Sequence, residues 1–144
     1  MRSGVLLDTG PIVAYLDDRD AHHAWAVATF SSVDLPAITC EAVLSEACFI
    51  AARGGRPAAR VLDYAMRARI RIGLRLDEEL AAVRALMERY ANVPMSLADA
   101  CLVRLAELTG LPICTLDSDF AIYRKEGRRA LELNIPEQRS FHEA

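Results

Sequence analysis

The stretch Gly4-Val5-Leu6-Leu7-Asp8-Thr9-Gly10-Pro11 decides the fold of this chain. Its short apolar run ends at an aspartate and is followed by Gly-Pro, which predicts a buried strand at the centre of a parallel sheet rather than an alternating edge strand. Open α/β sheets bind their ligands beyond the carboxyl ends of their strands. Asp8 therefore stands where a functional group is expected, although an aspartate at this place can also simply cap the following helix.

The composition of the 144-residue chain predicts one globular domain. Its apolar fraction of 53% is enough to fill one hydrophobic core. No apolar run approaches the length of a membrane span, and Asp8 comes too early for the hydrophobic part of a signal peptide. We therefore expect a single soluble domain over residues 1–144, located in the cytoplasm and not attached to a membrane.

The cysteines give no sign of a metal or redox motif. They form no C-x-x-C pair, and no histidines lie at zinc-finger spacing from them. Reduced and mostly buried thiols are the simplest interpretation. The cysteines are Cys40, Cys48, Cys101 and Cys114.

The basic residues are almost all arginine. The net charge of −3 argues against a basic coat for nucleic acid, but Lys125 is the only lysine among 17 basic residues. Arginine binds phosphate oxygens in pairs, so clusters of arginine predict local phosphate-binding patches. A GC-rich genome, which encodes arginine in place of lysine, explains the same bias. The clusters are Arg53, Arg56 and Arg60, then Arg67, Arg69, Arg71 and Arg75, then Arg124, Lys125, Arg128 and Arg129. The candidates for RNA contacts are Arg53, Arg56, Arg124 and Arg128.

Strand and helix patterns alternate along the chain, which predicts right-handed crossovers and a parallel sheet covered on both faces. The expected fold class is α/β, a three-layer α/β/α sandwich with a central parallel sheet of four or five strands. Strands are expected at about 4–7, 35–40, 70–76, 112–115 and 131–135. Helices are expected at about 11–16, 20–30, 41–53, 57–69, 77–91 and 96–109.

Two acidic residues follow predicted strands, and their side chains are expected to meet. Asp8 follows the first strand, and Asp117 follows the strand at 112–115. The carboxyl ends of parallel strands share one edge of a sheet, so these carboxylates can converge in the crevice between neighbouring strands. Either aspartate taken alone is as well explained as a loop residue or a helix cap.

Two further acids lie on predicted helices. Glu46 shares the inward stripe of its helix with Val43 and Ala47, and no Lys or Arg lies one turn away. An arginine from another part of the fold could neutralise it. Asp99 follows Ser96 by three residues, which is also ordinary helix-capping spacing.

Converging carboxylates would favour a divalent cation. Two carboxylates about 4 Å apart repel by roughly 4 kcal/mol at an effective dielectric constant near 20. Mg²⁺ and Mn²⁺ remove this cost, prefer oxygen ligands, and activate water while they bind phosphate oxygens. An all-acid site with arginines nearby therefore points to phosphodiester hydrolysis.

The ordered set of motifs resembles the PIN-domain nucleases, and most of all the small bacterial VapC-type toxins of toxin–antitoxin pairs. The resemblance covers nearly the whole chain, and the ordered set rather than any single motif is specific. The motifs are Leu-Leu-Asp8-Thr9, Glu46 in the helix after the second strand, Ser96-Leu-Ala-Asp99-Ala, and Thr115-Leu-Asp117-Ser-Asp119-Phe120.

The resemblance implies an endoribonuclease that depends on Mg²⁺ or Mn²⁺ and inhibits translation. It implies a homodimer and a cognate VapB-like antitoxin whose tail enters the active-site groove. By the same resemblance, the metal-site and catalytic acids are Asp8, Glu46, Asp99 and Asp117, with Asp119 as an extra or substitute ligand. Thr9, Ser96 and Thr115 would support the site, the two threonines through their hydroxyl groups.

Other classes fit the sequence less well. A response-regulator receiver domain needs paired acids after its first strand, where this chain has Asp8 and Thr9, and a lysine after a late strand, where Lys125 is misplaced. A haloacid-dehalogenase phosphatase needs a second Asp where Gly10 stands. No phosphate-binding Walker loop is present. A catalytically silent PIN-like domain that binds RNA or protein, and a PIN nuclease that processes RNA outside a toxin–antitoxin pair, remain as alternatives.

Overall fold

The opening strand lies at the centre of a five-stranded parallel sheet, in a computed structural model that describes residues 4–32 and 36–136. The strand order is β3-β2-β1-β4-β7, and each neighbouring pair is parallel. The chain turns back at β1, so β1 and β4 flank the point where the order of the strands reverses. The strands are β1 (Val5–Leu7), β2 (Ala37–Thr39), β3 (Arg71–Ile72), β4 (Ile113–Cys114) and β7 (Leu133–Asn134).

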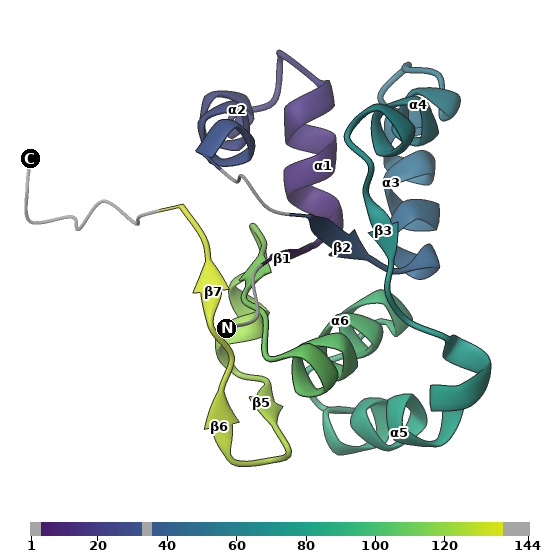
Figure 1. Cartoon of the computed structure of the whole chain (residues 1–144), viewed down its shortest axis with the longest axis vertical. Helices are drawn as coiled ribbons and strands as arrows, with labels where there is room; N and C mark the ends of the chain where they lie inside the picture. Colours follow the sequence, from purple (N-terminus) through teal and green to yellow (C-terminus); the bar gives the residue numbers. More distant parts are fainter. Residues whose placement is uncertain (1–3, 33–35, 137–144) are drawn as a thin grey trace, which may run out of the picture.

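Helices cover both faces of this sheet (Figure 1). The first four lie on one face and the last two on the other, which confirms the predicted three-layer α/β/α sandwich and the five-strand form of its sheet. No helix in the described part of the chain is long and apolar enough to cross a membrane. The helices are α1 (Thr9–Leu16), α2 (His23–Ser32), α3 (Glu41–Arg53), α4 (Ala59–Arg67), α5 (Leu76–Arg89) and α6 (Leu97–Thr109).

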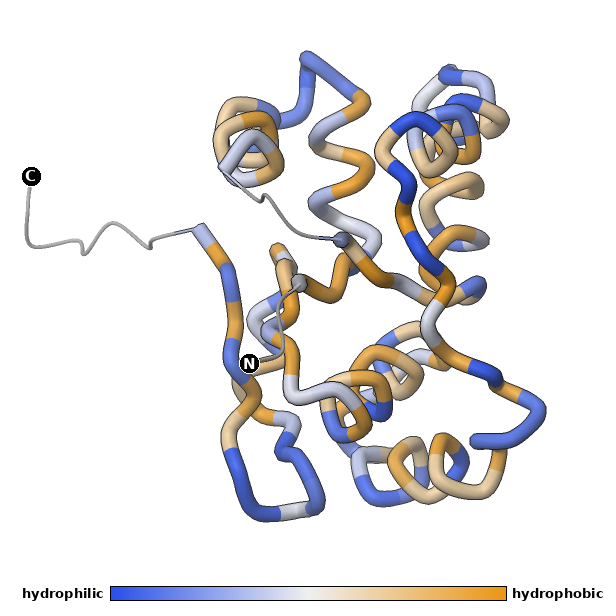
Figure 2. The backbone as a smooth tube through the Cα atoms, viewed as in Figure 1, coloured by the Kyte–Doolittle hydropathy of each residue, from blue (hydrophilic) through white to orange (hydrophobic). Residues whose placement is uncertain are grey.

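The central strand is apolar on both faces because both faces are covered. Leu6 is fully buried and Leu7 is 2% exposed, and the strand shows as an apolar segment in Figure 2. The core continues through α6, where Leu102 and Leu105 are fully buried. The four cysteines are free, as expected, and three of them are buried. The rigid centre of the fold therefore ends directly at Asp8.

The structure shortens one expected strand. A strand over 70–76 was predicted from alternating apolar residues, but β3 covers only Arg71–Ile72, and Leu76 already begins α5. The acids that follow Leu76 fill the first turn of α5, where they complement the helix dipole. The expected strand at 35–40 begins at Leu35, which lies outside the described residues.

A short antiparallel hairpin after α6 was not predicted. A 3-10 turn (η1, Ser118–Ala121) leads into β5 (Arg124–Lys125), which pairs with β6 (Arg129–Ala130). Glu126 and Gly127 form its turn with positive φ angles of 53° and 72°. Figure 2 shows this hairpin as a hydrophilic projection, and it gathers the third cluster of basic residues.

Candidate functional site

Asp8 lies where β1 ends and α1 begins, and its hydrogen bonds extend the strand pairing and cap the helix. Its backbone N–H donates to the carbonyl of Cys114 at 3.0 Å, which extends the β1–β4 pairing by one residue. Its Oδ1 accepts a hydrogen bond from the backbone N–H of Thr9 at 2.7 Å, so Asp8 is the N-cap of α1. The carboxylate is only 6% exposed. A buried acid that is fixed by two elements has very little freedom to move away.

Thr115 connects Asp8 to the segment that carries Asp117. The Thr115 hydroxyl is fully buried and donates to Oδ2 of Asp8 at 2.7 Å. The same hydroxyl oxygen accepts a hydrogen bond from the backbone N–H of Asp117 at 2.9 Å. The Asp117 carboxylate then caps η1 through the N–H of Asp119 at 2.9 Å. One hydroxyl therefore joins the carboxyl ends of β1 and β4.

Glu46 is held beside Asp8 by the residue that follows Asp8. The Thr9 hydroxyl donates to Oε2 of Glu46 at 3.1 Å. Glu46 lies on the second turn of α3 and is partly buried. The sequence predicted Glu46 on the inward side of its helix, the resemblance named Thr9 as a supporting hydroxyl, and the structure pairs these two side chains.

Asp99 fulfils its capping role and also meets a residue that the sequence did not single out. The N–H of Asp99 donates to Oγ of Ser96 at 3.1 Å, and the N–H of Ser96 donates to Oδ2 of Asp99 at 3.3 Å. The phenol of Tyr123, which is fully buried, donates to the same Oδ2 at 3.3 Å. The capping box and Tyr123 together fix the orientation of the Asp99 carboxylate. No local pattern marks Tyr123, because it lies 24 residues away in the chain.

Neighbouring acids raise the pKa of two members of the cluster, Asp8 and Asp99. The pKa of Asp8 is raised to about 6, mainly because the side chain is buried; the negative charges of Asp99 and Asp117 add to the rise, and the hydrogen bonds from Thr115 and Thr9 oppose it. Burial also raises the pKa of Asp99, and Asp117 and Glu46 contribute to that rise. The structure therefore brings acids from four separate elements into one electrostatic cluster.

No basic side chain compensates this cluster within residues 4–32 and 36–136. All the ion pairs there lie at other acids, such as Asp17, Glu79 and Glu88. Buried like charges without a counterion are costly. None of the five acids considered for the site forms an ion pair with a described residue; these acids are Asp8, Glu46, Asp99, Asp117 and Asp119.

The donor set fits a hard divalent cation better than a soft metal. The cluster offers carboxylate oxygens, which suit Mg²⁺ and Mn²⁺, and these ions keep several waters when one or two carboxylates bind them. In the described part of the chain, no three acidic, histidine or cysteine side chains are close enough to form a complete ligand group. A cation held by one or two of these carboxylates would take its remaining ligands from water.

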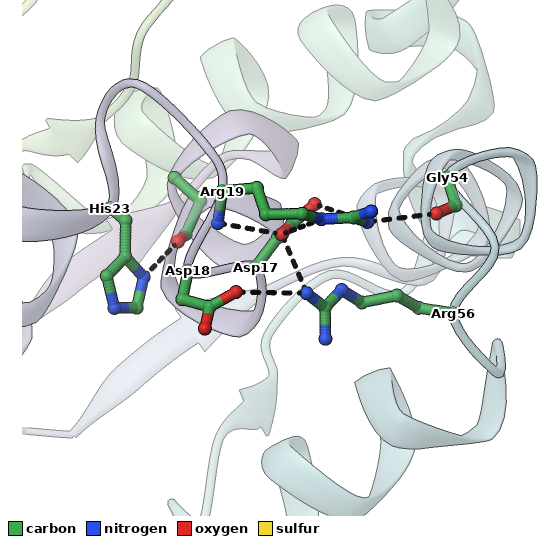
Figure 3. Close-up of polar contacts among 7 residues, drawn as sticks. Asp17, Asp18, Arg19, His23, Gly54 and Arg56 are labelled. Atoms are coloured by element: carbon green, nitrogen blue, oxygen red, sulfur yellow. Dashed lines mark hydrogen bonds and ion pairs between the residues drawn. The ribbon is translucent and has the colours of Figure 1, made fainter.

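Arg56, considered above for RNA, forms ion pairs with two aspartates that do not belong to the acid cluster (Figure 3). Its Nη2 contacts Oδ1 of Asp17 at 2.9 Å and Oδ1 of Asp18 at 3.1 Å. Arg19 and, to a lesser degree, Arg56 hold the pKa of Asp17 below its usual range. Arg19 also donates to the carbonyl of Gly54 at 3.1 Å, so the group ties the end of α1 to the end of α3.

The other candidate arginines differ in whether their guanidinium groups already bind other groups of the protein. Nη1 of Arg124 donates to the carbonyls of Ala121, Ile122 and Tyr123 at 2.6, 3.2 and 3.0 Å, so it closes the turn after η1. Arg53 and Arg128 are exposed and take part in no ion pair among the described residues. Of the four arginines considered for RNA, these two have guanidinium groups available to a phosphate.

A pocket of about 190 Å³ lies on the helical layer rather than at the acids. It is bordered by α1, α3 and α4, and Val13, Leu16, Ile50 and Arg56 are among the residues that line it. Its wall is mainly apolar and holds none of the clustered acids. We place the candidate site at the acids, because the proposed chemistry requires charged groups and this pocket has none of the clustered ones.

The chain is thus a parallel α/β/α sandwich with acids gathered near the carboxyl ends of its central strands β1 and β4. The family model for the PIN domain matches residues 5–126, so this chain belongs to the PIN domain family. Among solved structures it is similar to VapC20 of Mycobacterium tuberculosis, a toxin that cleaves the sarcin–ricin loop, with a TM-score of 0.71. The two are 23% identical, and the match covers 82% of this chain and 93% of VapC20. A comparison with curated proteins gives no match.

Proposed function

We propose that this chain is a Mg²⁺- or Mn²⁺-dependent endoribonuclease that acts as the toxin of a toxin–antitoxin pair. The observation that carries the proposal is the cluster of Asp8, Glu46, Asp99 and Asp117, in which neighbouring acids raise the pKa of Asp8 and Asp99 and which has no basic partner in the described part of the chain. A domain that only bound RNA would keep this repulsion without a use for it. Membership in the PIN domain family supports the same activity.

The residues have distinct roles in this proposal. Asp8 would hold the cation together with Asp99 or Asp117, and the remaining acids, Glu46 and Asp119 among them, would orient bound water. A bound divalent cation lowers the pKa of water and neutralises charge on the scissile phosphate. Thr115 and Thr9 donate hydrogen bonds to Asp8 and Glu46, which keeps both carboxylates oriented. Ser96 fixes the start of α6 and with it Asp99.

The substrate class and the partners in this proposal are supported by the family and the fold. The likeness to VapC20, which cleaves the sarcin–ricin loop, supports RNA as the substrate class. A homodimer, a VapB-like antitoxin, inhibition of translation and a cytoplasmic location belong to the same proposal, as does a single nuclease domain over residues 1–144. Co-purification of the chain with the product of an adjacent small reading frame, and its mass by ultracentrifugation, test the partner and the dimer.

The activity is tested with an isosteric change at the buried acid. Asp8→Asn keeps the shape of the side chain and removes its charge, so we expect loss of RNA cleavage in Mg²⁺ or Mn²⁺. The matched control is Asp63→Asn on α4, where the side chain is exposed and outside the cluster. Full cleavage by Asp8→Asn, or unchanged cleavage by the wild type in excess EDTA, would contradict the proposal. Circular dichroism confirms that each variant is folded.

Metal binding is tested separately from activity. A cation that binds only the folded state raises the melting temperature by mass action. Mg²⁺ or Mn²⁺ is therefore expected to raise the melting temperature of the wild type and of Asp63→Asn more than that of Asp8→Asn. Equal shifts in all three proteins would place the metal elsewhere.

A further inference from the structure

Phe49 is the only exposed aromatic residue in the described part of the chain. Its side chain is 62% exposed, whereas Phe120 and Tyr123 are fully buried, and the other described aromatic residues are buried or partly buried. Aromatic side chains normally contribute to cores because each buries a large apolar area. An exposed ring on an otherwise well-packed domain indicates a surface that binds something.

The position of Phe49 relates it to the acid cluster. It follows Glu46 by three residues on α3, and Arg53 follows it by four, so all three lie on one side of the helix. The buried side of α3 is carried by Val43 and Ala47. The carboxylate of Glu46, the ring of Phe49 and the guanidinium of Arg53 therefore follow one another along α3, with Glu46 at the end that belongs to the acid cluster.

Arg53 already covers the ring. Its Cζ lies 5.7 Å from the centroid of the Phe49 ring, within the range of a cation–π contact. The guanidinium is exposed and forms no ion pair with any described residue. The pair thus offers a flat apolar surface and a free positive charge side by side.

We propose that Phe49 and Arg53 form a stacking platform for a base of single-stranded RNA next to the acid cluster. The ring accepts the base on its surface, and the Arg53 guanidinium binds a neighbouring phosphate. Base stacking on aromatic rings, combined with arginine contacts, is how proteins bind single strands with little sequence preference. This inference rests on the proposed nuclease function, and it assigns substrate positioning to a side chain outside the acid cluster.

Charge complementarity favours RNA over a protein partner at this place. The acids repel an anionic strand, so an RNA substrate needs a cation close by, and Arg53 supplies one on the same helix face as Glu46. Two other exposed apolar residues belong to different surfaces: Ile50 lines the pocket between α1, α3 and α4, and Met66 lines the hollow beside it. Phe49 lines neither of these two.

Binding of a short mixed-sequence oligoribonucleotide, measured by fluorescence anisotropy in EDTA to prevent cleavage, tests the platform. Phe49→Leu keeps an apolar side chain but removes the ring face, and we expect it to weaken binding by about 5- to 150-fold. Phe49→Trp is expected to retain binding. Leu80→Ala on α5, where an apolar side chain is 58% exposed, is the matched control and is expected to bind as the wild type does.

An abasic scan of the same oligoribonucleotide distinguishes stacking from a general change of the surface. Removal of the stacked base is expected to weaken binding to the wild type and to leave binding to Phe49→Leu unchanged. Equal binding by wild type and Phe49→Leu would overturn the platform, as would a change of oligomeric state in Phe49→Leu without a change in RNA affinity. A wild type that neither binds nor cleaves RNA would instead contradict the proposed function itself.

Discussion

The hydroxyl of Thr115 donates a 2.7 Å hydrogen bond to Oδ2 of Asp8, and the two residues lie 107 positions apart in the chain. Because the same oxygen accepts the N–H of Asp117, this single hydroxyl joins the Asp8 carboxylate to the backbone that carries Asp117. The orientation of Asp8 relative to Asp117 therefore depends on one buried side chain.

Thr115→Val tests this alignment, because valine has the same shape and lacks the hydroxyl. It leaves a buried oxygen of Asp8 and the N–H of Asp117 without their partner, which costs about 1–3 kcal/mol of folding free energy. We expect RNA cleavage to fall at least about tenfold, since a misplacement of catalytic groups by about 1 Å has effects of that order. Urea unfolding and gel-based cleavage measure the two effects.

Thr115→Ser is the control for that change, because serine keeps the hydroxyl and loses only a buried methyl group. It is expected to lose about 1 kcal/mol of stability and to retain most of the cleavage. If Thr115→Val cleaved as well as Thr115→Ser, the hydroxyl would have no part in aligning the acids.

The raised pKa of Asp8 predicts how the metal-free protein responds to pH. The folded state holds a proton on Asp8 up to about pH 6, whereas the unfolded chain releases it near its ordinary pKa of 3.8. The contribution of Asp8 to the stability of the folded state is therefore fully present below pH 3.8 and is lost as the pH rises through about 6. The shift corresponds to about 3 kcal/mol, and the raised pKa of Asp99 acts in the same direction.

The comparison of wild type with Asp8→Asn isolates this contribution from all other titrating groups. In EDTA, the stability of the wild type relative to Asp8→Asn is expected to decrease between about pH 4 and about pH 7. Added Mg²⁺ is expected to remove the decrease. A constant difference between the two proteins across this range would mean that Asp8 has an ordinary pKa.

Local signals in the sequence were sufficient for much of the fold. An apolar run that ends at Asp8 predicts a buried strand, and the Ser96-x-x-Asp99 spacing predicts a helix start, because both depend on neighbours in the chain. The structure confirms the parallel sandwich and the capping box. The resemblance to PIN-domain nucleases supplied the order of the acids, which no single motif specifies.

Long-range contacts and weak turn signals were not predictable in this way. Tyr123 gains its role only where the fold brings it to Asp99, and the partner of Glu46 is likewise set by packing. The hairpin of β5 and β6 turns at Glu126-Gly127, which lacks the Asn-Gly or Asp-Gly sequence that usually marks such turns. The strand at 70–76 was predicted too long because Leu76 continues the alternation and yet begins a helix.

The contact of Tyr123 with Asp99 gives a third prediction. Tyr123→Phe removes one hydrogen bond to a carboxylate that keeps its bond from Ser96. We expect the concentration of Mn²⁺ needed for half-maximal cleavage to rise about 10- to 100-fold, the usual effect of losing a group that orients a metal ligand. The melting temperature of the metal-free protein is expected to change little.

Tyr90→Phe is the matched control for this change. The Tyr90 hydroxyl accepts the N–H of Arg124 at 2.9 Å, and its ring packs edge-on against Tyr123. Tyr90 contacts the same part of the fold without touching a clustered acid. The concentration of Mn²⁺ that Tyr90→Phe needs for half-maximal cleavage is therefore expected to equal that of the wild type. The same rise in both variants would assign the effect to packing around Tyr123 rather than to Asp99.

The arginines differ in whether their charge is already paired, and this yields a fourth prediction. Arg128→Gln removes a guanidinium that has no acidic partner among the described residues, so the slope of log affinity for RNA against log salt is expected to fall by about one. Arg56→Gln breaks the contacts with Asp17 and Asp18, so it is expected to lower the melting temperature and to leave the salt slope unchanged.

Anisotropy titrations over a series of salt concentrations, with thermal unfolding of both variants, separate the two roles. An unchanged slope in Arg128→Gln would mean that the hairpin does not touch the RNA backbone, and a lower slope in Arg56→Gln would mean that RNA displaces its acidic partners.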